Sequence, residues 1–331
     1  MTTTAVEWAA SREAEALGHH WLGEEHLLLA VAEEAGRDRD DLVTALVDHL
    51  ERYGPPVPKR GEGCMSAPSY HTIRGRAEGL ALAEGMAAPE ARHVTQALLW
   101  DPRGVPALLL NRGDATAPPL PPNPLLAPAE REAVAMGYPF IGAEHVVLAL
   151  LGGQPDDLAG QALRGCGLDH DSVAAKVLES WTGGLPPCPP QAGVTSAGQN
   201  PHSRELLARA EGLAGGTGDI GSHHGLIAFL WGEEGLSAFQ LEWWGTTALA
   251  VVEALERLGV RLPTVPRPEP ERTPWGEPVF VPLDRYGDVV RALSEQLDAG
   301  TWGCNSHDDR AWVDAQAHID LQSIVDRVLA S

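Results

Sequence analysis

The side chains in this sequence that could do chemistry are thirteen histidines, many carboxylates and four cysteines. A metal site needs such groups at fixed spacings. The pairs His19-His20 and His223-His224, and the segment 304–309 with one cysteine, one histidine and two aspartates, are the candidate ligand groups. Adjacent histidines on a helix point to different sides, and the spacing fixes no third ligand. We therefore expect no metal and no cofactor.

Catalytic motifs are absent from the sequence. It contains no phosphate-binding Gly-x-x-x-x-Gly-Lys-Ser/Thr loop, no His-Glu-x-x-His and no nucleophile elbow. We expect a protein that is not an enzyme, with no catalytic residues. The widely scattered cysteines predict reduced thiols rather than a disulfide framework; they are Cys64, Cys166, Cys188 and Cys304.

Charge and hydropathy exclude further classes of function. The formal net charge of −22 would repel nucleic acid and anionic lipid. The sequence has no run of about eighteen apolar residues and does not start with a signal peptide. We expect a cytoplasmic protein that binds neither nucleic acid nor a membrane.

One histidine recurs four times in the same sequence context. These copies are His26, His93, His145 and His224. An apolar run follows each histidine and predicts a helix buried on most sides. A glycine stands eight positions before each histidine, where its left-handed conformation can close a preceding helix. These glycines are Gly18, Gly85, Gly137 and Gly216.

Each copy is therefore predicted to form a helical hairpin, which must pack against a neighbour to bury its apolar face. Proline-rich segments divide the copies. We expect an all-α fold with one module at 1–117 (copies one and two), a linker at 118–124 that acts as a semi-rigid spacer, and a second module at 125–262 (copies three and four). Residues 263–331 form an extension, with a short extended element at 278–282 and helices at 286–297 and 309–329.

Two of the copies resemble a known family closely. The segments Leu17–Leu29 and Met136–Leu148 are similar to the N-terminal repeat of Clp unfoldase ATPases, whose hallmark is Gly-Thr/Ser-Glu-His. The resemblance implies two tandem Clp N-terminal-type modules. The hallmark glutamate is kept as Glu25 and Glu144, but Arg92 and His223 replace it in the other copies. The Thr/Ser position holds Glu24, Ala91, Ala143 and Ser222.

In that family the N-terminal domain docks adaptors, and in some members it receives proteins marked with phosphoarginine, whose guanidinium the glutamate holds. A helix N-terminus also suits phosphoryl oxygens. By this resemblance the candidate ligand-binding residues are Glu24, Glu25, Glu144, Ser222 and His223. The alternative is that the carboxylates only complement the helix dipole, and that the four histidines are structural and hydrogen-bonded at a helix start.

Because the ATPase motif is missing, the leading hypothesis is a stand-alone adaptor or decoy of the Clp system. Its partners would be protein or peptide ligands, such as phosphoarginine-containing proteins or cyclic-peptide natural products, and a Clp ATPase or its adaptors. The alternative is a protein-interaction scaffold without a small-ligand pocket. Trp243-Trp244 could leave one indole exposed as a contact anchor.

Overall fold

The computed structural model describes residues 3–19, 21–53, 65–110, 112–181, 193–215, 219–232 and 236–267. Helices dominate this part of the chain, and its only strands are two residues long, so the all-α prediction is confirmed. The extended element and two helices expected at 278–329 lie outside the described residues.

The first two copies of the repeat form one helical module. Its helices are α1 (Thr3–Ala16), α2 (Glu24–Ala30), α3 (Arg39–Tyr53), α4 (Pro68–Ala83), α5 (Ala91–Leu98) and α6 (Val105–Leu109). β1 (Trp21–Leu22) pairs in parallel with β2 (Met65–Ser66), which ties the first copy to the second. A hydrophobic core built from both copies fills the module, with Val6, Leu28 and Leu42 fully buried.

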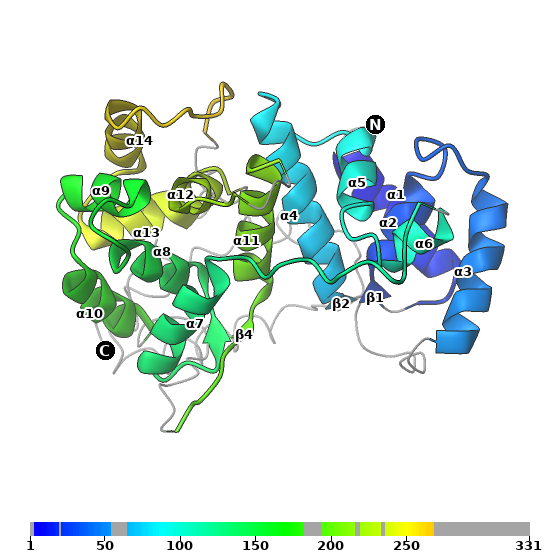
Figure 1. The fold of residues 1–331 in the computed structure, drawn as a ribbon, viewed down its shortest axis with the longest axis horizontal. Coiled ribbons are helices and arrows are strands. Elements are labelled where there is room, and N and C mark those ends of the chain that lie inside the picture. The colour runs from blue at the N-terminus through cyan, green and yellow to red at the C-terminus, as the bar shows by residue number, and fades with distance from the viewer. Residues whose placement is uncertain are drawn as a thin grey trace, which may run out of the picture.

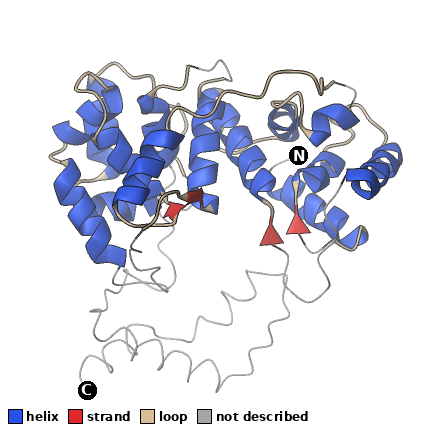
Figure 2. Ribbon diagram, turned by 60° about the horizontal axis from the view of Figure 1, so that its bottom comes forward, coloured by secondary structure: helices blue, strands red, loops and turns tan. Residues whose placement is uncertain are grey.

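The third and fourth copies form a larger module in the same way. Its helices are α7 (Leu126–Ala135), α8 (Ala143–Leu151), α9 (Leu158–Gly165), α10 (His170–Trp181), α11 (Pro201–Leu213), α12 (Ser222–Leu230), α13 (Leu236–Trp244) and α14 (Ala248–Arg257). β3 (Phe140–Ile141) pairs in parallel with β4 (Gly198–Gln199). Each copy here adds two helices after its hairpin, whereas the first copy adds only α3 and the second only α6. Figure 2 shows the two short strand pairs beside the helices.

Glycines close the first helix of each copy, with one difference from the sequence prediction. Gly18, Gly85 and Gly137 follow α1, α4 and α7 with φ of 69°, 77° and 79°. In the fourth copy Gly215, with φ of 68°, has this role. The prediction of Gly216 is therefore wrong by one residue, and Gly216 itself lies outside the described residues. Either of two adjacent glycines can adopt this conformation, so local sequence does not choose between them.

The two modules pack directly on each other through α4 and α11, which lie side by side in the centre of the molecule (Figure 1). The two backbones come very close, because glycines face the partner helix. A Cβ atom added to Gly79 would lie 2.2 Å from the carbonyl oxygen of Arg209, and one added to Gly212 would lie 2.3 Å from that of Arg76. The proline-rich linker therefore does not hold the modules apart as a spacer.

Two reciprocal ion pairs flank this glycine contact. Arg209 Nε donates to Glu78 Oε2 at 2.8 Å, and Arg76 Nε donates to Glu211 Oε2 at 2.7 Å. The members of these pairs occupy equivalent positions in the two modules, because their separation in sequence equals that between β2 and β4, the second strands of the two strand pairs. The equivalent residues are Arg76 and Arg209, Glu78 and Glu211, and Gly79 and Gly212. The module interface is thus pseudo-symmetric, like the isologous interface of a twofold dimer.

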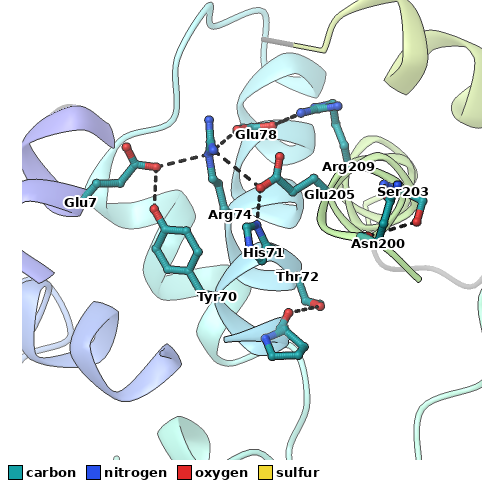
Figure 3. A network of polar contacts seen from close by, with 11 residues as sticks. Glu7, Tyr70, His71, Thr72, Arg74, Glu78, Asn200, Ser203, Glu205 and Arg209 are labelled. Atoms are coloured by element: carbon teal, nitrogen blue, oxygen red, sulfur yellow. Dashed lines mark hydrogen bonds and ion pairs between the residues drawn. The ribbon is translucent and has the colours of Figure 1, made fainter. Parts of the chain in front are cut away.

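A second polar network at the interface is not symmetric (Figure 3). His71 Nδ1 lies 2.6 Å from Glu205 Oε1, and Arg74 Nη1 lies 3.5 Å from the same oxygen. Arg74 Nε also reaches Glu7 at 3.2 Å, so α1 joins the network. The positions on α11 that correspond to His71 and Arg74 are Arg204 and Leu207. The asymmetry favours pairing of α4 with α11 over pairing of either helix with a copy of itself.

Candidate functional site

The four repeated histidines cap the second helix of each copy. The backbone N–H of the N-cap residue donates to the histidine Nδ1 at 2.8–3.0 Å in every copy. The N-cap residues are Gly23, Glu90, Gly142 and Gly221. Because Nδ1 accepts this bond, a neutral ring carries its proton on Nε2. Burial lowers the pKa of His145 to about 4, which keeps that ring neutral.

In the first copy the hallmark carboxylate, that of Glu25, already has a hydrogen-bond partner. The indole Nε1 of Trp21 donates to Glu25 Oε1 at 2.7 Å. His26 Nε2 lies 2.7 Å from His19 Nδ1, and the His19 ring stacks on Trp21 with centroids 4.3 Å apart. Glu25 therefore sits in a small network of rings, where a ligand guanidinium would have to compete with Trp21.

His19, Glu25 and His26 bring potential metal-ligand atoms within 4.8 Å of one another. The capping bond decides against a metal here. Since the Nδ1 atom of His26 accepts the Gly23 N–H at 2.9 Å, its Nε2 atom holds the proton and donates to His19 instead of binding an ion. His20 lies outside the described residues.

Glu24 has a different environment from Glu25. Burial raises its pKa to about 7, and the neighbouring carboxylates of Glu25 and Asp101 add to this effect. Arg76 acts in the opposite direction. At neutral pH Glu24 is therefore partly protonated, whereas Glu25 is distinguished by the bond that it accepts from Trp21.

Glu144 in the third copy is the most unusual candidate. It is only 8% exposed, and its Oε1 atom is buried without a hydrogen-bond partner. The side chain folds back over the N-cap, where a Cβ on Gly142 would overlap the carboxylate. His145 Nδ1 lies 3.3 Å from the Glu144 Oε1 atom but already accepts the Gly142 N–H. The Nε2 atom of His145 is buried and unpartnered. Burial raises the pKa of Glu144 to about 7.

Glu144→Gln is expected to stabilise the protein at pH 8 by about 2 to 3 kcal/mol and to change little at pH 4.5. The pKa of Glu144 rises from 4.5 in a free chain to about 7 when folded, so the folded state keeps a proton that the unfolded state has lost. The stability that the wild-type protein gains from keeping this proton is complete below pH 4.5 and is lost as the pH rises through 7. Urea unfolding at pH 4.5, 6 and 8 measures the free energy of unfolding of both proteins. If Glu144→Gln differs from the wild type by the same free energy at all three pH values, the raised pKa is contradicted.

Ser222 and His223 belong to the N-terminus of α12. The Ser222 hydroxyl donates to Asp157 Oδ1, and Asp157 itself caps α9 by accepting from the Ala159 N–H at 3.2 Å. Burial lowers the pKa of His223, whose ring folds over Gly221 and packs 4.0 Å from His224. Ser222 therefore joins two helices of the module.

Arg92 replaces the hallmark glutamate in the second copy and pairs with two carboxylates, one of which belongs to the N-cap residue. Its Nη2 atom lies 2.6 Å from Glu84 Oε2, and its Nε atom donates to Glu90 Oε2 at 3.0 Å. The N-cap residue is accordingly Glu90, whereas the other three copies have glycine. The difference has a steric reason, because in those copies the residue two positions later folds over the cap and leaves no room for a Cβ atom.

The structure identifies residues of the site and of the module interface that the sequence did not predict. Trp21, the partner of Glu25, carried no sequence signal beyond its position in the motif. Gly75 and Gly79 stand four apart within a helical segment, a spacing typical of close helix contact, and this signal could have been used. Trp244 is buried in the core, as expected for at least one of the two tryptophans, whereas Trp243 packs against the core and is only partly buried.

Comparison with known proteins agrees with this geometry. Residues 123–243 match the family model of the Clp repeat (R) N-terminal domain. A search of curated proteins found no match. Among the described residues, no helix has the length and apolar character needed to cross a membrane. Domains of this family mediate protein interactions in the Clp system. The segment similar to the Clp repeat (R) N-terminal domain, residues 123–243, thus holds the third copy and most of the fourth.

Proposed function

We propose that the protein is a non-catalytic, cytoplasmic binding protein of the Clp protease system, acting as a stand-alone adaptor or decoy for protein or peptide ligands. The observation that carries this proposal is the buried Glu144 carboxylate, whose Oε1 atom lacks a hydrogen-bond partner. A buried acceptor without a partner costs about 1–3 kcal/mol. A ligand that brings a donor to this oxygen recovers that energy.

A guanidinium group is the donor with the best match. It presents several N–H groups in a plane and pairs with carboxylates in a bidentate manner. The start of α8 adds backbone N–H groups and a positive dipole end for a neighbouring phosphoryl group. Ala143 supplies no hydroxyl there, so the backbone has to hold the phosphoryl oxygens. Phosphoarginine-marked proteins are therefore the first ligand class to test.

Calorimetry with free phosphoarginine and a phosphoarginine peptide is expected to show binding that Glu144→Gln removes. Because Glu144 must ionise to pair with the guanidinium and its pKa is about 7, the affinity should rise by about tenfold from pH 6 to pH 8. Glu25→Gln is the matched control, since Trp21 already occupies the Glu25 carboxylate. No heat at millimolar ligand, or equal loss in both variants, contradicts the proposal.

The second candidate is a protein-interaction scaffold without a small-ligand pocket. Several hallmark positions already have partners within the protein, which favours this candidate. Glu25 bonds to Trp21, and Ser222 bonds to Asp157. Arg92 pairs with Glu84 and Glu90. Under this reading the helical surfaces bind other chains, and Clp-targeting peptides and phosphoarginine show no saturable binding. The same calorimetric titration separates the two functions.

A further inference from the structure

The first and third copies can be compared within one chain, because both keep the hallmark glutamate. Glu25 and Glu144 are the second residues of α2 and α8, and both helices begin after a glycine N-cap. In each copy an aromatic residue stands four positions before the glutamate and begins a short strand of a parallel pair. This residue is Trp21 in the first copy and Phe140 in the third. The backbone therefore holds the two aromatic residues at equivalent positions relative to the carboxylates.

The two carboxylates nevertheless differ in their hydrogen bonds. The indole N–H of Trp21 donates to Glu25 Oε1 at 2.7 Å. A phenylalanine side chain has no N–H or O–H group, and in the third copy Glu144 Oε1 is buried without a hydrogen-bond partner. The presence of one indole N–H group thus determines whether the hallmark carboxylate has a donor inside the protein.

Ring contacts and strand pairing hold Trp21 at the carboxylate. Its indole stacks on the His19 ring, with centroids 4.3 Å apart and planes 9° apart. His19 Nδ1 lies 2.7 Å from the Nε2 atom of His26, the residue that caps α2. The carbonyl oxygen of the next residue, Leu22, accepts the Ala67 N–H at 2.8 Å. A donor that is fixed in advance loses little freedom when it bonds, so a ligand has to supply a better donor to replace it.

We propose that Trp21 is an internal lid on the first hallmark site, because its indole N–H occupies the Glu25 oxygen that a ligand guanidinium would use. The module of copies one and two then carries a second, closed guanidinium site. The third copy keeps its acceptor for the ligand, since Phe140 has no side-chain N–H. This inference rests on the function proposed above, because it concerns the same ligand chemistry.

Trp21→Phe places the third-copy residue in the first copy and removes the indole N–H. Calorimetric titration of the full chain with phosphoarginine at pH 8 is expected to show two sites per chain, against one in the wild type. The affinity at Glu25 should rise at least tenfold. Glu25→Gln in the Trp21→Phe background should return the number of sites to one. Trp8→Phe is the matched control, because it makes the same change at a tryptophan of α1 that is 64% exposed, and it should leave one site.

Phe140→Trp is the reciprocal change. Its indole N–H should reach Glu144 as Trp21 reaches Glu25, and phosphoarginine binding should weaken at least tenfold. Bulk alone would also weaken binding, so a second readout uses the protein without ligand. A hydrogen bond to the ionised carboxylate lowers its pKa. Glu144→Gln should therefore lose its stabilising effect at pH 8 in the Phe140→Trp background, as measured by urea unfolding.

The outcomes separate the lid from the function on which it rests. Binding by Trp21→Phe but not by the wild type, at a site that Glu25→Gln removes, supports the lid and contradicts the Glu144 site. One site in both the wild type and Trp21→Phe overturns the lid and leaves the proposed function standing. No heat from any variant at millimolar phosphoarginine overturns both. A Phe140→Trp protein that Glu144→Gln still stabilises at pH 8 overturns the role of the indole N–H.

Discussion

Arg209→Met is expected to lower the free energy of unfolding by about 3–5 kcal/mol. Arg209 and Glu78 are only 5% and 4% exposed, and they form the buried half of the reciprocal ion pairs between α4 and α11. Arg209 Nη1 also donates to the carbonyl oxygen of Ala228 at 3.0 Å, which links the interface to α12. Removing the Arg209 guanidinium takes a partner from the buried Glu78 carboxylate and leaves the buried Ala228 carbonyl without its donor.

The pseudo-symmetry of the interface supplies the control for this prediction. Arg76→Met removes the corresponding ion pair, but Arg76 and Glu211 are more exposed, at 12% and 17%, so a loss of about 1 kcal/mol is expected. Glu78→Met combined with Arg209→Met should recover part of the stability, because no buried charge then lacks a partner. Urea unfolding followed by circular dichroism measures all three. Equal losses for Arg209→Met and Arg76→Met would show that burial does not set the strength of these pairs.

Gly79→Ala is expected to destabilise the protein by about 3 kcal/mol, although alanine is the better helix former. The added Cβ atom would lie 2.2 Å from the Arg209 carbonyl oxygen and 2.8 Å from the Cα atom of Gly212. Both are backbone atoms, so no side-chain rotation relieves the overlap. The two helices have to move apart, which also weakens the ion pairs on either side.

Gly165→Ala is the matched control, because Gly165 lies in α9 and a Cβ there meets nothing within 4 Å. This change should stabilise the protein by about 0.5–1 kcal/mol through helix propensity alone. The prediction is therefore a difference in sign between two glycine-to-alanine changes in helices. Small-angle scattering of Gly79→Ala should also show a larger radius of gyration as the modules separate. A neutral or stabilising Gly79→Ala would mean that α4 and α11 do not pack as described.

Fixed packing of the modules matters for the proposed function. The hallmark glutamates Glu25 and Glu144 lie on opposite sides of the α4–α11 contact, in α2 and α8 (Figure 1). The interface holds these two helix starts at one separation, so a partner protein that contacts both modules meets one fixed surface. A mobile linker alone would not provide this, because its length would allow many separations.

The sequence by itself determined the class of fold, the repeat and its resemblance to the Clp N-terminal repeat. These features depend on local rules: apolar residues at helical spacing, a glycine that can close a helix, and a histidine next to a helix start. Such signals act within a few residues, so they survive without tertiary information. The one boundary error, Gly216 for Gly215, comes from two adjacent residues with the same local preference.

Only the tertiary structure decided which side chains meet. Trp21 bonds to Glu25, Asp157 to Ser222, and Glu78 to Arg209, and the last two pairs are separated by dozens of residues or more. The same holds for the docking of the modules. The physical reason is that hydrogen bonding, burial and pKa depend on neighbours that folding brings together, and these neighbours are set by packing rather than by local sequence preference.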